Sequence, residues 1–208
     1  MSAQYGAGMG SERFVDTGIY LVEFLDDVWV RCPRCQAPAQ VRTPEPYWQS
    51  QPRFTCPSCA LTIEGRHTRW YGPAAGRASG QCTRCDRPFQ RTLEGRDSTP
   101  KEIDVRCEGC GATRRATVSW SFHTGTRALE PSYGLDLRLQ TPCMGETLWA
   151  YNDRHVDFLT TYVTATLRER TANHNASLVS RLPPWMKLAK NRRTVLRSLE
   201  RLRSEAGA

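Results

Sequence analysis

Short stretches in the first two thirds of the chain alternate apolar and polar residues, a pattern typical of β-strands. Ile19–Val22 and Val28–Val30 predict two strands joined by a turn, although a short helix over Val22–Leu25 is an alternative for the first. Further strands are expected at Ala116–Phe122 and Leu135–Leu139. This part of the chain is therefore predicted to be β-rich.

Beyond residue 152 the apolar residues recur at the three- and four-residue spacing of amphipathic helices. A first helix would begin after Asn152 or Asp153 as N-cap and end before the break at 173–176. A short helix over 177–182, a bend at Pro183-Pro184 and a final helix from 191 to about 204 are expected to follow. The predicted buried stripes are Val156, Leu159, Val163 and Leu167 in the first helix, and Val195, Leu196, Leu199 and Leu202 in the last.

The chain contains an internal repeat of about fifty residues. RCPRCQAPAQ at 31–40 aligns with QCTRCDRPFQ at 81–90, and a second CxxC pair follows each of these segments. The stretch 72–80 between the copies is rich in glycine and alanine, which predicts a linker. Two copies of one folding unit are therefore expected.

Eight of the nine cysteines occur in the four CxxC pairs. Two residues between cysteines let one tight turn direct both sulfurs at one zinc ion, and zinc favours four thiolates in a tetrahedron. About twenty residues separate the pairs within each copy, a spacing typical of zinc ribbons. We therefore expect two structural zinc ions per chain. The predicted ligands are Cys32, Cys35, Cys56 and Cys59 at one site, and Cys82, Cys85, Cys107 and Cys110 at the other.

Spacing alone leaves open which pairs share an ion. Cys59 and Cys82 are close enough for a cross-braced arrangement of the first pair with the third, although the repeat favours pairing within each copy. No secretory signal is recognisable, so a reducing, cytoplasmic compartment is expected, where disulfides are disfavoured. Cys143 is expected to be a small half-buried residue, with a reactive or third-metal role as the alternative. The histidines lie at no ligand spacing and are expected to be solvated or capping.

The motifs CPRC…CPSC and CTRC…CEGC resemble the zinc ribbons of the transcription-factor-IIB type, over about residues 28–121. This resemblance implies that the eight cysteines of the motifs are zinc ligands. TPCMGETLWAYN and RLPPWMKLAKNRRTVLRSLERLR are similar to bacterial zinc-ribbon proteins to which no activity is assigned. Only Gly111 supplies the glycine that usually follows the second cysteine; Gln36, Ala60 and Asp86 take its place in the other pairs.

The predicted fold is a small α+β protein, in which two tandem β-rich zinc ribbons precede a C-terminal helical segment. A degenerate third half-ribbon is expected between them, because TPCMGETLW has the strand, turn, strand pattern of a knuckle that retains only Cys143. The expected divisions are a disordered tail (1–13), the first ribbon (14–71), a linker (72–80), the second ribbon (81–122), the hairpin (123–151) and a basic helical region (152–208).

The formal net charge of +8 is concentrated at the C-terminus, where residues 151–208 carry eleven basic and five acidic residues. Such a surface suits the phosphate backbone of a nucleic acid, so we expect nucleic acid or a nucleoprotein as partner; a solvated helix face is the alternative. The basic residues concerned are Lys187, Lys190, Arg192, Arg193, Arg197 and Arg201. The ribbons add Arg34, Arg53, Arg84, Arg87, Arg114 and Arg115, with Trp48 and Phe89 for base stacking.

A protein–protein adaptor is the alternative function, because acidic residues are frequent in the second ribbon and the terminal helices could dock a protein partner. An enzyme is not expected. No nucleophile–base pair, phosphate loop or open three-ligand metal site is recognisable, and four thiolates leave a zinc ion no position for water. No apolar run approaches 18 residues, so no membrane partner is expected either.

Overall fold

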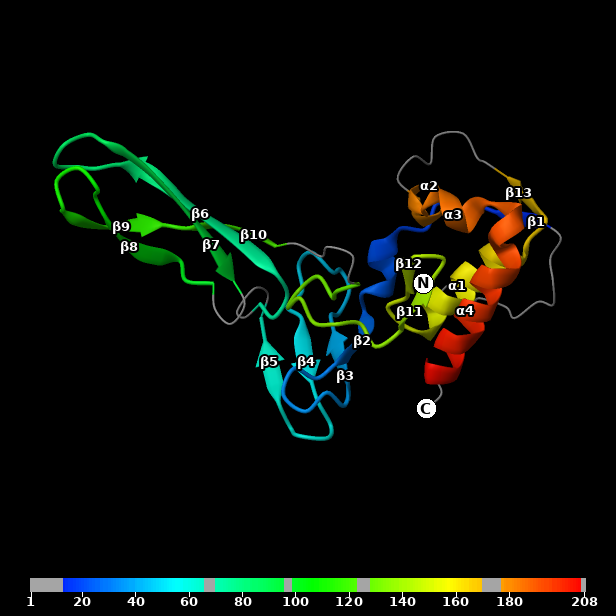
Figure 1. Cartoon of the computed structure of the whole chain (residues 1–208). Coiled ribbons are helices and arrows are strands. Elements are labelled where there is room, and N and C mark those ends of the chain that lie inside the picture. The colour runs from blue at the N-terminus through cyan, green and yellow to red at the C-terminus, as the bar shows by residue number, and fades with distance from the viewer. Residues whose placement is uncertain (1–12, 66–69, 96–98, 123–127, 170–176, 207–208) are drawn as a thin grey trace.

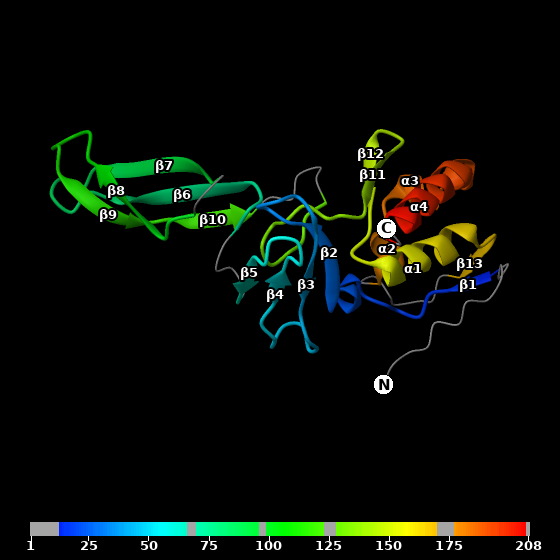
Figure 2. The same cartoon turned by 90° about the horizontal axis from the view of Figure 1, so that it is seen from below.

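The computed structural model describes residues 13–65, 70–95, 99–122, 128–169 and 177–206. The chain forms three parts in a row: an arm of residues 74–122, a central first ribbon of residues 27–64, and a helical module of residues 152–206 (Figure 1). A view turned by 90° shows the same order (Figure 2). The predicted fold class is confirmed. Of the predicted disordered tail, residues 1–12 lie outside the described residues and Arg13 begins a strand.

The first ribbon is one antiparallel sheet with the strand order β2-β3-β4-β5. Its inward-facing residues Val28, Val30, Val41 and Phe54 are at most 1% exposed and belong to the main core. This core also includes helical-module residues, so the first ribbon and the helices are stabilised by one continuous apolar cluster. The strands are β2 (Asp27–Arg31), β3 (Pro38–Arg42), β4 (Arg53–Thr55) and β5 (Thr62–Glu64).

The strand predicted at Ile19–Val22 is wrong, and the helical alternative is closer. A 3₁₀ helix, η1, covers Leu21–Phe24. The side chain of Glu23 accepts a hydrogen bond from the Tyr20 backbone N–H at 2.8 Å, which is one half of a capping box and favours a helical turn here. Phe24 is buried in the main core, so the turn directs its largest side chain inward.

The arm consists of two small sheets, β10-β6-β7 and β8-β9. The linker predicted at 72–80 is wrong, because β6 occupies 74–81 and pairs with β7 along its whole length. Its small residues serve packing: a Cβ on Gly76 would lie 2.8 Å from the Trp120 ring. The strands are β6 (Ala74–Gln81), β7 (Pro88–Gly95), β8 (Glu102–Arg106), β9 (Thr113–Thr117) and β10 (Ser119–Phe122).

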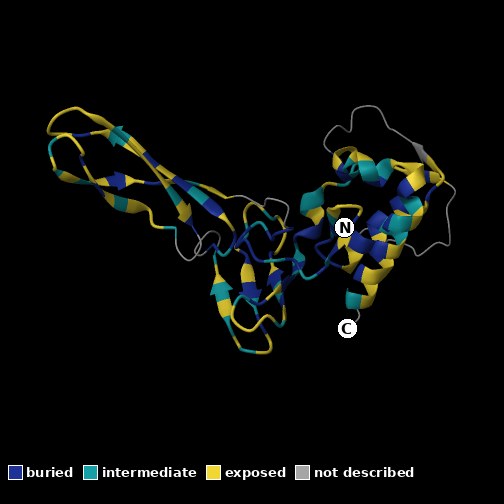
Figure 3. Cartoon of the chain, in the orientation of Figure 1, coloured by how far each residue is buried: buried dark blue, intermediate teal, exposed yellow. Residues whose placement is uncertain are grey.

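The arm has a thin core of its own. Among the described residues, its buried cluster consists of Ala78, Val105, Ala116 and Val118, and Phe89, Leu93, Ile103 and Trp120 pack against it. Most other arm residues are exposed or half-buried (Figure 3). So small a core supplies little hydrophobic stabilisation, and the arm must depend on another source.

At its root, the arm is held by Trp70 and by the segment after residue 127. The Trp70 ring lies 4.5 Å from the Phe122 ring, centroid to centroid, and its Nε1 donates to the Pro73 carbonyl at 3.3 Å. Gly134 has a φ of +68°, and a Cβ there would lie 2.6 Å from the Trp70 ring. The connection to the arm thus packs directly on backbone that belongs to the main core.

The predicted alternation at Leu135–Leu139 is confirmed, since all three leucines are at most 2% exposed while Asp136 and Arg138 are half-buried. The segment forms isolated bridges instead of a full strand. It runs along the free edge of β2: the Arg31 N–H donates to the Asp136 carbonyl at 2.9 Å, and the Arg138 N–H donates to the Trp29 carbonyl at 2.9 Å. This pairing covers an edge of the first ribbon that would otherwise lie open.

The hairpin that follows consists of β11 (Gln140–Cys143) and β12 (Glu146–Trp149). Its two turn residues, Met144 and Gly145, both have positive φ, at 57° and 82°. This is the conformation of a type I′ turn. A two-residue turn of this kind is a plain β-hairpin, so the structure does not show the degenerate zinc knuckle expected here.

Helix α1 (Asp153–Thr164) begins at the predicted N-cap, because the Asn152 side chain accepts from the His155 N–H at 3.0 Å. Val156, Leu159 and Val163 are buried as predicted. Leu167 is not: the helix ends at Thr164, and Leu167 is 58% exposed in strand β13 (Leu167–Glu169), which pairs in parallel with β1 (Arg13–Val15). The predicted break at 173–176 lies outside the described residues.

The remaining helices follow the predicted order: α2 (Leu178–Arg181), α3 (Pro184–Lys187), a 3₁₀ turn η2 (Ala189–Asn191) and α4 (Arg192–Ala206). In α4, Val195, Leu199 and Leu202 are at most 1% exposed and belong to the main core, whereas Leu196 is half-buried. Helix α4 packs against α1 and β11. No helix among the described residues combines the length and apolarity needed to span a membrane.

Candidate metal centres

Each of the four CxxC pairs lies in the turn of a hairpin, and all four hairpins close in the same register. The residue before the first cysteine pairs with the residue three positions after the second. The N–H of the first cysteine donates to the carbonyl two positions after the second; for Cys32 and Ala37 the distance is 2.9 Å. The closing pairs are Arg31 with Pro38, Thr55 with Thr62, Gln81 with Pro88, and Arg106 with Thr113.

The residue after the second cysteine is left-handed in every turn, whether or not it is glycine. Gln36, Ala60, Asp86 and Gly111 have φ values of 61°, 55°, 55° and 71°. Non-glycine residues adopt this conformation at a cost of about 1–2 kcal/mol, so three of the four turns are strained. Metal coordination that holds both sulfurs of a turn is a physical reason for such strain to persist.

The sulfur positions confirm the pairing within each repeat and rule out the cross-braced arrangement. Sγ of Cys32 lies 3.6 Å from that of Cys59, and Sγ of Cys82 lies 3.6 Å from that of Cys110. All four sulfur atoms of each cluster lie within 4.8 Å of one another. Tetrahedral zinc with Zn–S bonds of about 2.3 Å would separate them by about 3.8 Å. Each cluster therefore fits one zinc ion, and the two make two per chain.

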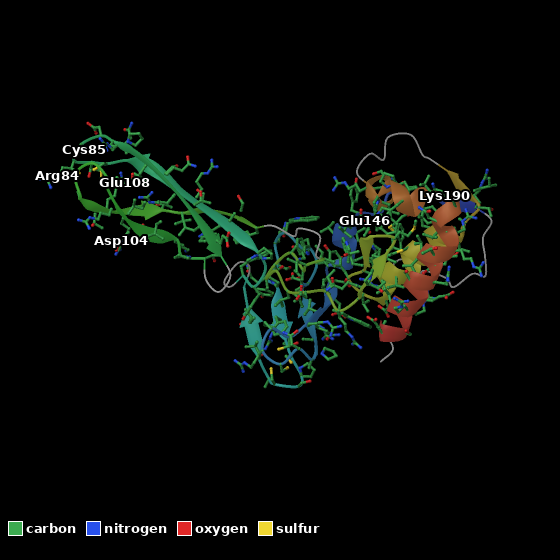
Figure 4. All side chains as sticks on the ribbon, in the orientation of Figure 1. Arg84, Cys85, Asp104, Glu108, Glu146 and Lys190 are labelled. Carbon is green, nitrogen blue, oxygen red and sulfur yellow. The ribbon has the colours of Figure 1, made fainter. Side chains whose placement is uncertain are left out.

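The two centres lie in different surroundings. Cys32 and Cys56 are buried like Cys82 and Cys107 of the second centre, but they belong to the main core, so the first centre adjoins the continuous cluster that includes the helices. The second centre lies at the far tip of the arm, where Cys85 and Arg84 are exposed (Figure 4). The first centre is thus stabilised by apolar packing of the main core. The fold around the second centre must depend mostly on metal binding.

Without metal, the thiols of the second centre differ in acidity. The backbone N–H groups of Cys110 and Gly109 stabilise the Cys107 thiolate and lower the pKa of this thiol to about 6. The Arg87 N–H favours the Cys85 thiolate, but the neighbouring thiols of Cys107 and Cys110 outweigh it and raise the pKa of Cys85 to about 11. The four thiols therefore do not all ionise near neutral pH, and zinc binding displaces protons from the cluster.

The predicted basic residues of the C-terminus fall into two groups. Lys187, Arg192 and Arg201 are engaged within the fold, donating to the Ser180 carbonyl at 2.8 Å, the Ala165 carbonyl at 3.0 Å and the Thr141 hydroxyl at 3.2 Å. Lys190, Arg193 and Arg197 are exposed, and so is Arg201 despite its hydrogen bond. The binding role of all six residues stays a prediction.

Among the other residues singled out in the sequence, Cys143 lies in the main core as a small apolar residue, but it is fully buried, at 3% exposure, where a half-buried position was expected. His155 corrects the prediction for the histidines. It is 2% exposed, stacks on Phe24 with ring centroids 4.7 Å apart, and burial lowers its pKa to about 3. His67, His123 and His174 lie outside the described residues.

Sequence reasoning missed a groove of about 160 Å³ beside the second centre, which Arg91 and Arg106 help to line. Arg91 lies opposite Ala78 in the β6–β7 register, and Ala78 is a core residue of the arm. Placing Arg91 beside the arm core requires the pairing of β6 with β7. Because the sequence predicts a linker over residues 72–80, it does not indicate this pairing.

The comparisons with known proteins leave the family open. No protein-family model matches the chain, and no curated protein or solved structure matches it either. The resemblance to zinc ribbons of the transcription-factor-IIB type, and to bacterial proteins in particular, therefore stays a prediction. The geometry on its own supports the broader conclusion that the chain is a zinc-binding protein with two four-cysteine centres consistent with zinc ribbons.

Proposed function

We propose that this protein is a non-enzymatic nucleic-acid-binding protein whose two zinc ions are structural. The observation that carries the proposal is the exposed basic face at the start of α4, formed by Lys190, Arg193 and Arg197. Neither arginine forms an ion pair or side-chain hydrogen bond with another described residue. Unpaired cations on one helix face are suited to replace the counterions of a phosphate backbone.

The same helix limits the strength of this surface. Glu200 is exposed three residues after Arg197, on the same face of α4. Arg203 is ion-paired with Asp157 of α1, so its charge is already partly neutralised, unlike the charges of Arg193 and Arg197. The face therefore carries a modest excess of positive charge, which suits backbone contacts that position a nucleic acid and read no bases.

Aromatic exposure adds support for a single-stranded ligand. Trp48 is 70% exposed, at the tip of a tight turn in which the Gln49 and Ser50 N–H groups both donate to the Pro46 carbonyl. An exposed ring held on an ordered turn suits base stacking. Phe89 does not, because the Arg114 guanidinium lies over its ring at 5.1 Å from the centroid.

The chemistry of the centres supports a role without catalysis. A zinc ion bound by four thiolates has no vacant position at which to activate water or polarise a substrate. The local turns hold all four sulfurs of each cluster within reach of one ion. We therefore assign the metal to stabilising the fold, with binding carried by the surfaces that the fold presents.

Arg193→Gln/Arg197→Gln is expected to weaken binding of a single-stranded oligonucleotide about tenfold at low salt. The slope of log K against log salt should become shallower by about 0.7 for each phosphate that the variant no longer neutralises. Fluorescence anisotropy across a salt series measures both quantities. The matched control is Arg154→Gln/Arg203→Gln, which removes the same charge from arginines committed to Asp26 and Asp157.

The control should retain wild-type affinity within about twofold. Equal losses in the two double variants would mean that net charge alone governs binding. If the wild-type protein shows no binding at about 50 mM salt, the proposal is wrong and the protein–protein adaptor becomes the better interpretation.

A further inference from the structure

Four arginines are among the eleven residues that line a groove between the two sheets of the arm, beside the second zinc centre. It has a volume of about 160 Å³ and lies among β7, β8 and β9. Its charged lining consists of Arg87, Arg91, Arg106, Arg114 and Glu108. Glu108 lies near Cys85 at the tip of the arm, so the groove is at the end farthest from the helical module (Figure 4).

The strand register places Arg114 in a position where an apolar residue is expected. Residues that face each other across β8 and β9 share one side, and on the inner side Ile103, Val105 and Ala116 pack in or against the arm core. Arg114 pairs with Val105 and lies on this same side. Its neighbour Arg115 lies on the outer side, 3.8 Å from carboxylate oxygens of both Glu102 and Asp104.

Arg114 is incompletely satisfied within the described part of the chain. Its Nη1 donates to the Gln81 carbonyl, and its guanidinium lies over the Phe89 ring. Its Nε is buried and has no hydrogen-bond partner among the described residues. A buried guanidinium N–H without an acceptor is unfavourable, so the groove has a donor that an oxyanion would satisfy.

The groove combines positive side chains with one carboxylate beside the second zinc centre. Arg91 forms an ion pair with Glu108 at 2.7 Å, and the hydrogen bond from Arg91, with the charges of Arg91 and Arg87, lowers the pKa of Glu108. The Arg87 side chain packs against Gly109, and a Cβ added at Gly109 would lie 2.9 Å from Nε of Arg87. Arg106 pairs with Thr113 on the outer side of β8 and β9 and does not add to this charge. The other three guanidiniums balance one carboxylate and a zinc–tetrathiolate centre of charge −2.

We propose that this groove binds a phosphate group, and that in the nucleic-acid complex the phosphate comes from the backbone of the strand. The guanidiniums of Arg87, Arg91 and Arg114 beside one small space match a tetrahedral oxyanion with several acceptor oxygens. The claim that the phosphate belongs to a nucleic acid rests on the proposed function. The claim that the groove binds a phosphate group does not. The competing interpretation is that these arginines only neutralise the zinc–thiolate charge.

The test compares Arg114→Gln with Arg115→Gln, which removes the same charge one residue away on the outer side of β9. Arg114→Gln is expected to lower the affinity for a single-stranded oligonucleotide about fivefold and to reduce the salt slope by about 0.7, while Arg115→Gln changes neither. Both variants should retain two zinc ions by elemental analysis. Loss of zinc from Arg114→Gln alone, or equal affinities of the two variants, would overturn the proposal.

A second readout separates the groove from the proposed function. In the zinc-loaded full-length protein, the NMR signal of the Arg114 Nε–H is expected to shift on addition of inorganic phosphate, but not of chloride at the same ionic strength. A shift without oligonucleotide binding by the wild type would leave a free-phosphate site and refute the nucleic-acid function. If the signal shifts but Arg114→Gln leaves the oligonucleotide affinity unchanged, the phosphate bound in the groove does not come from the nucleic-acid backbone. No shift refutes the site itself.

Discussion

Cys107→Ser is expected to unfold the arm while the first ribbon and the helical module stay folded. Among the described residues, the apolar cluster of the arm has four buried members, whereas a structural zinc site contributes about 10–16 kcal/mol to folding. Loss of one thiolate from the second centre removes most of that contribution. Hydrogen exchange measured by mass spectrometry should show fast exchange across residues 74–122 and protection near that of wild type in α1 and α4.

The matching substitution in the first centre should behave differently. Cys56 is 3% exposed within the main core, so Cys56→Ser disturbs the cluster that also packs α1 and α4. Protection is then expected to fall in the helical module as well as in the first ribbon. Cys143→Ser is the control, because Cys143 is a thiol buried in the same core but outside both four-cysteine centres, and its loss should leave two bound zinc ions. An arm that stays protected in Cys107→Ser would contradict this account.

Stability is also expected to depend on pH through His155. Burial holds the pKa of this imidazole at about 3, against 6.5 when it is exposed in the unfolded chain. Between these values the unfolded state binds a proton that the folded state does not, so stability is fully present above pH 6.5 and falls as the pH is lowered. The shift corresponds to several kcal/mol in total, of which about 2 kcal/mol should be lost between pH 6.5 and pH 5.

His155→Gln removes this titration while it keeps a side chain able to accept from the Tyr151 N–H, as Nδ1 of His155 does at 3.3 Å. Urea unfolding monitored by near-UV circular dichroism should give a free energy of unfolding that depends less on pH in the variant than in the wild type. Zinc release in acid affects both proteins alike, so the difference between the slopes isolates His155. Equal slopes would show that the imidazole is accessible to protons in the folded state.

The metal centres were predictable because their determinants are local. Two intervening residues fix the turn that directs both sulfurs of a pair at one ion, and the repeat identified which pairs belong together. The left-handed residues were partly predictable too: Gly111 suits that conformation, whereas Gln36, Ala60 and Asp86 gave no such sign and adopt it nevertheless. The closed turn, with its hydrogen bond at the first cysteine, outweighs their individual preference.

What the sequence did not reveal depends on contacts between distant segments. Residues 74–80 are rich in the small residues of a linker, but at Gly76 a small residue is required because the Trp120 ring packs on it. The end of α1 at Thr164 was also missed, and Thr160 and Thr161 each donate a side-chain hydrogen bond back to a carbonyl four residues earlier, an interaction that weakens helices. Likewise, Arg201 belongs to a basic row in sequence and donates to Thr141 in space.

The most direct test of the central claim is zinc K-edge X-ray absorption on protein of known metal content. Two zinc ions per chain, each with four sulfur neighbours at about 2.3 Å, are expected from the two four-cysteine clusters. A single zinc ion per chain, or nitrogen and oxygen neighbours at about 2.0–2.1 Å, would contradict the assignment of two closed structural centres.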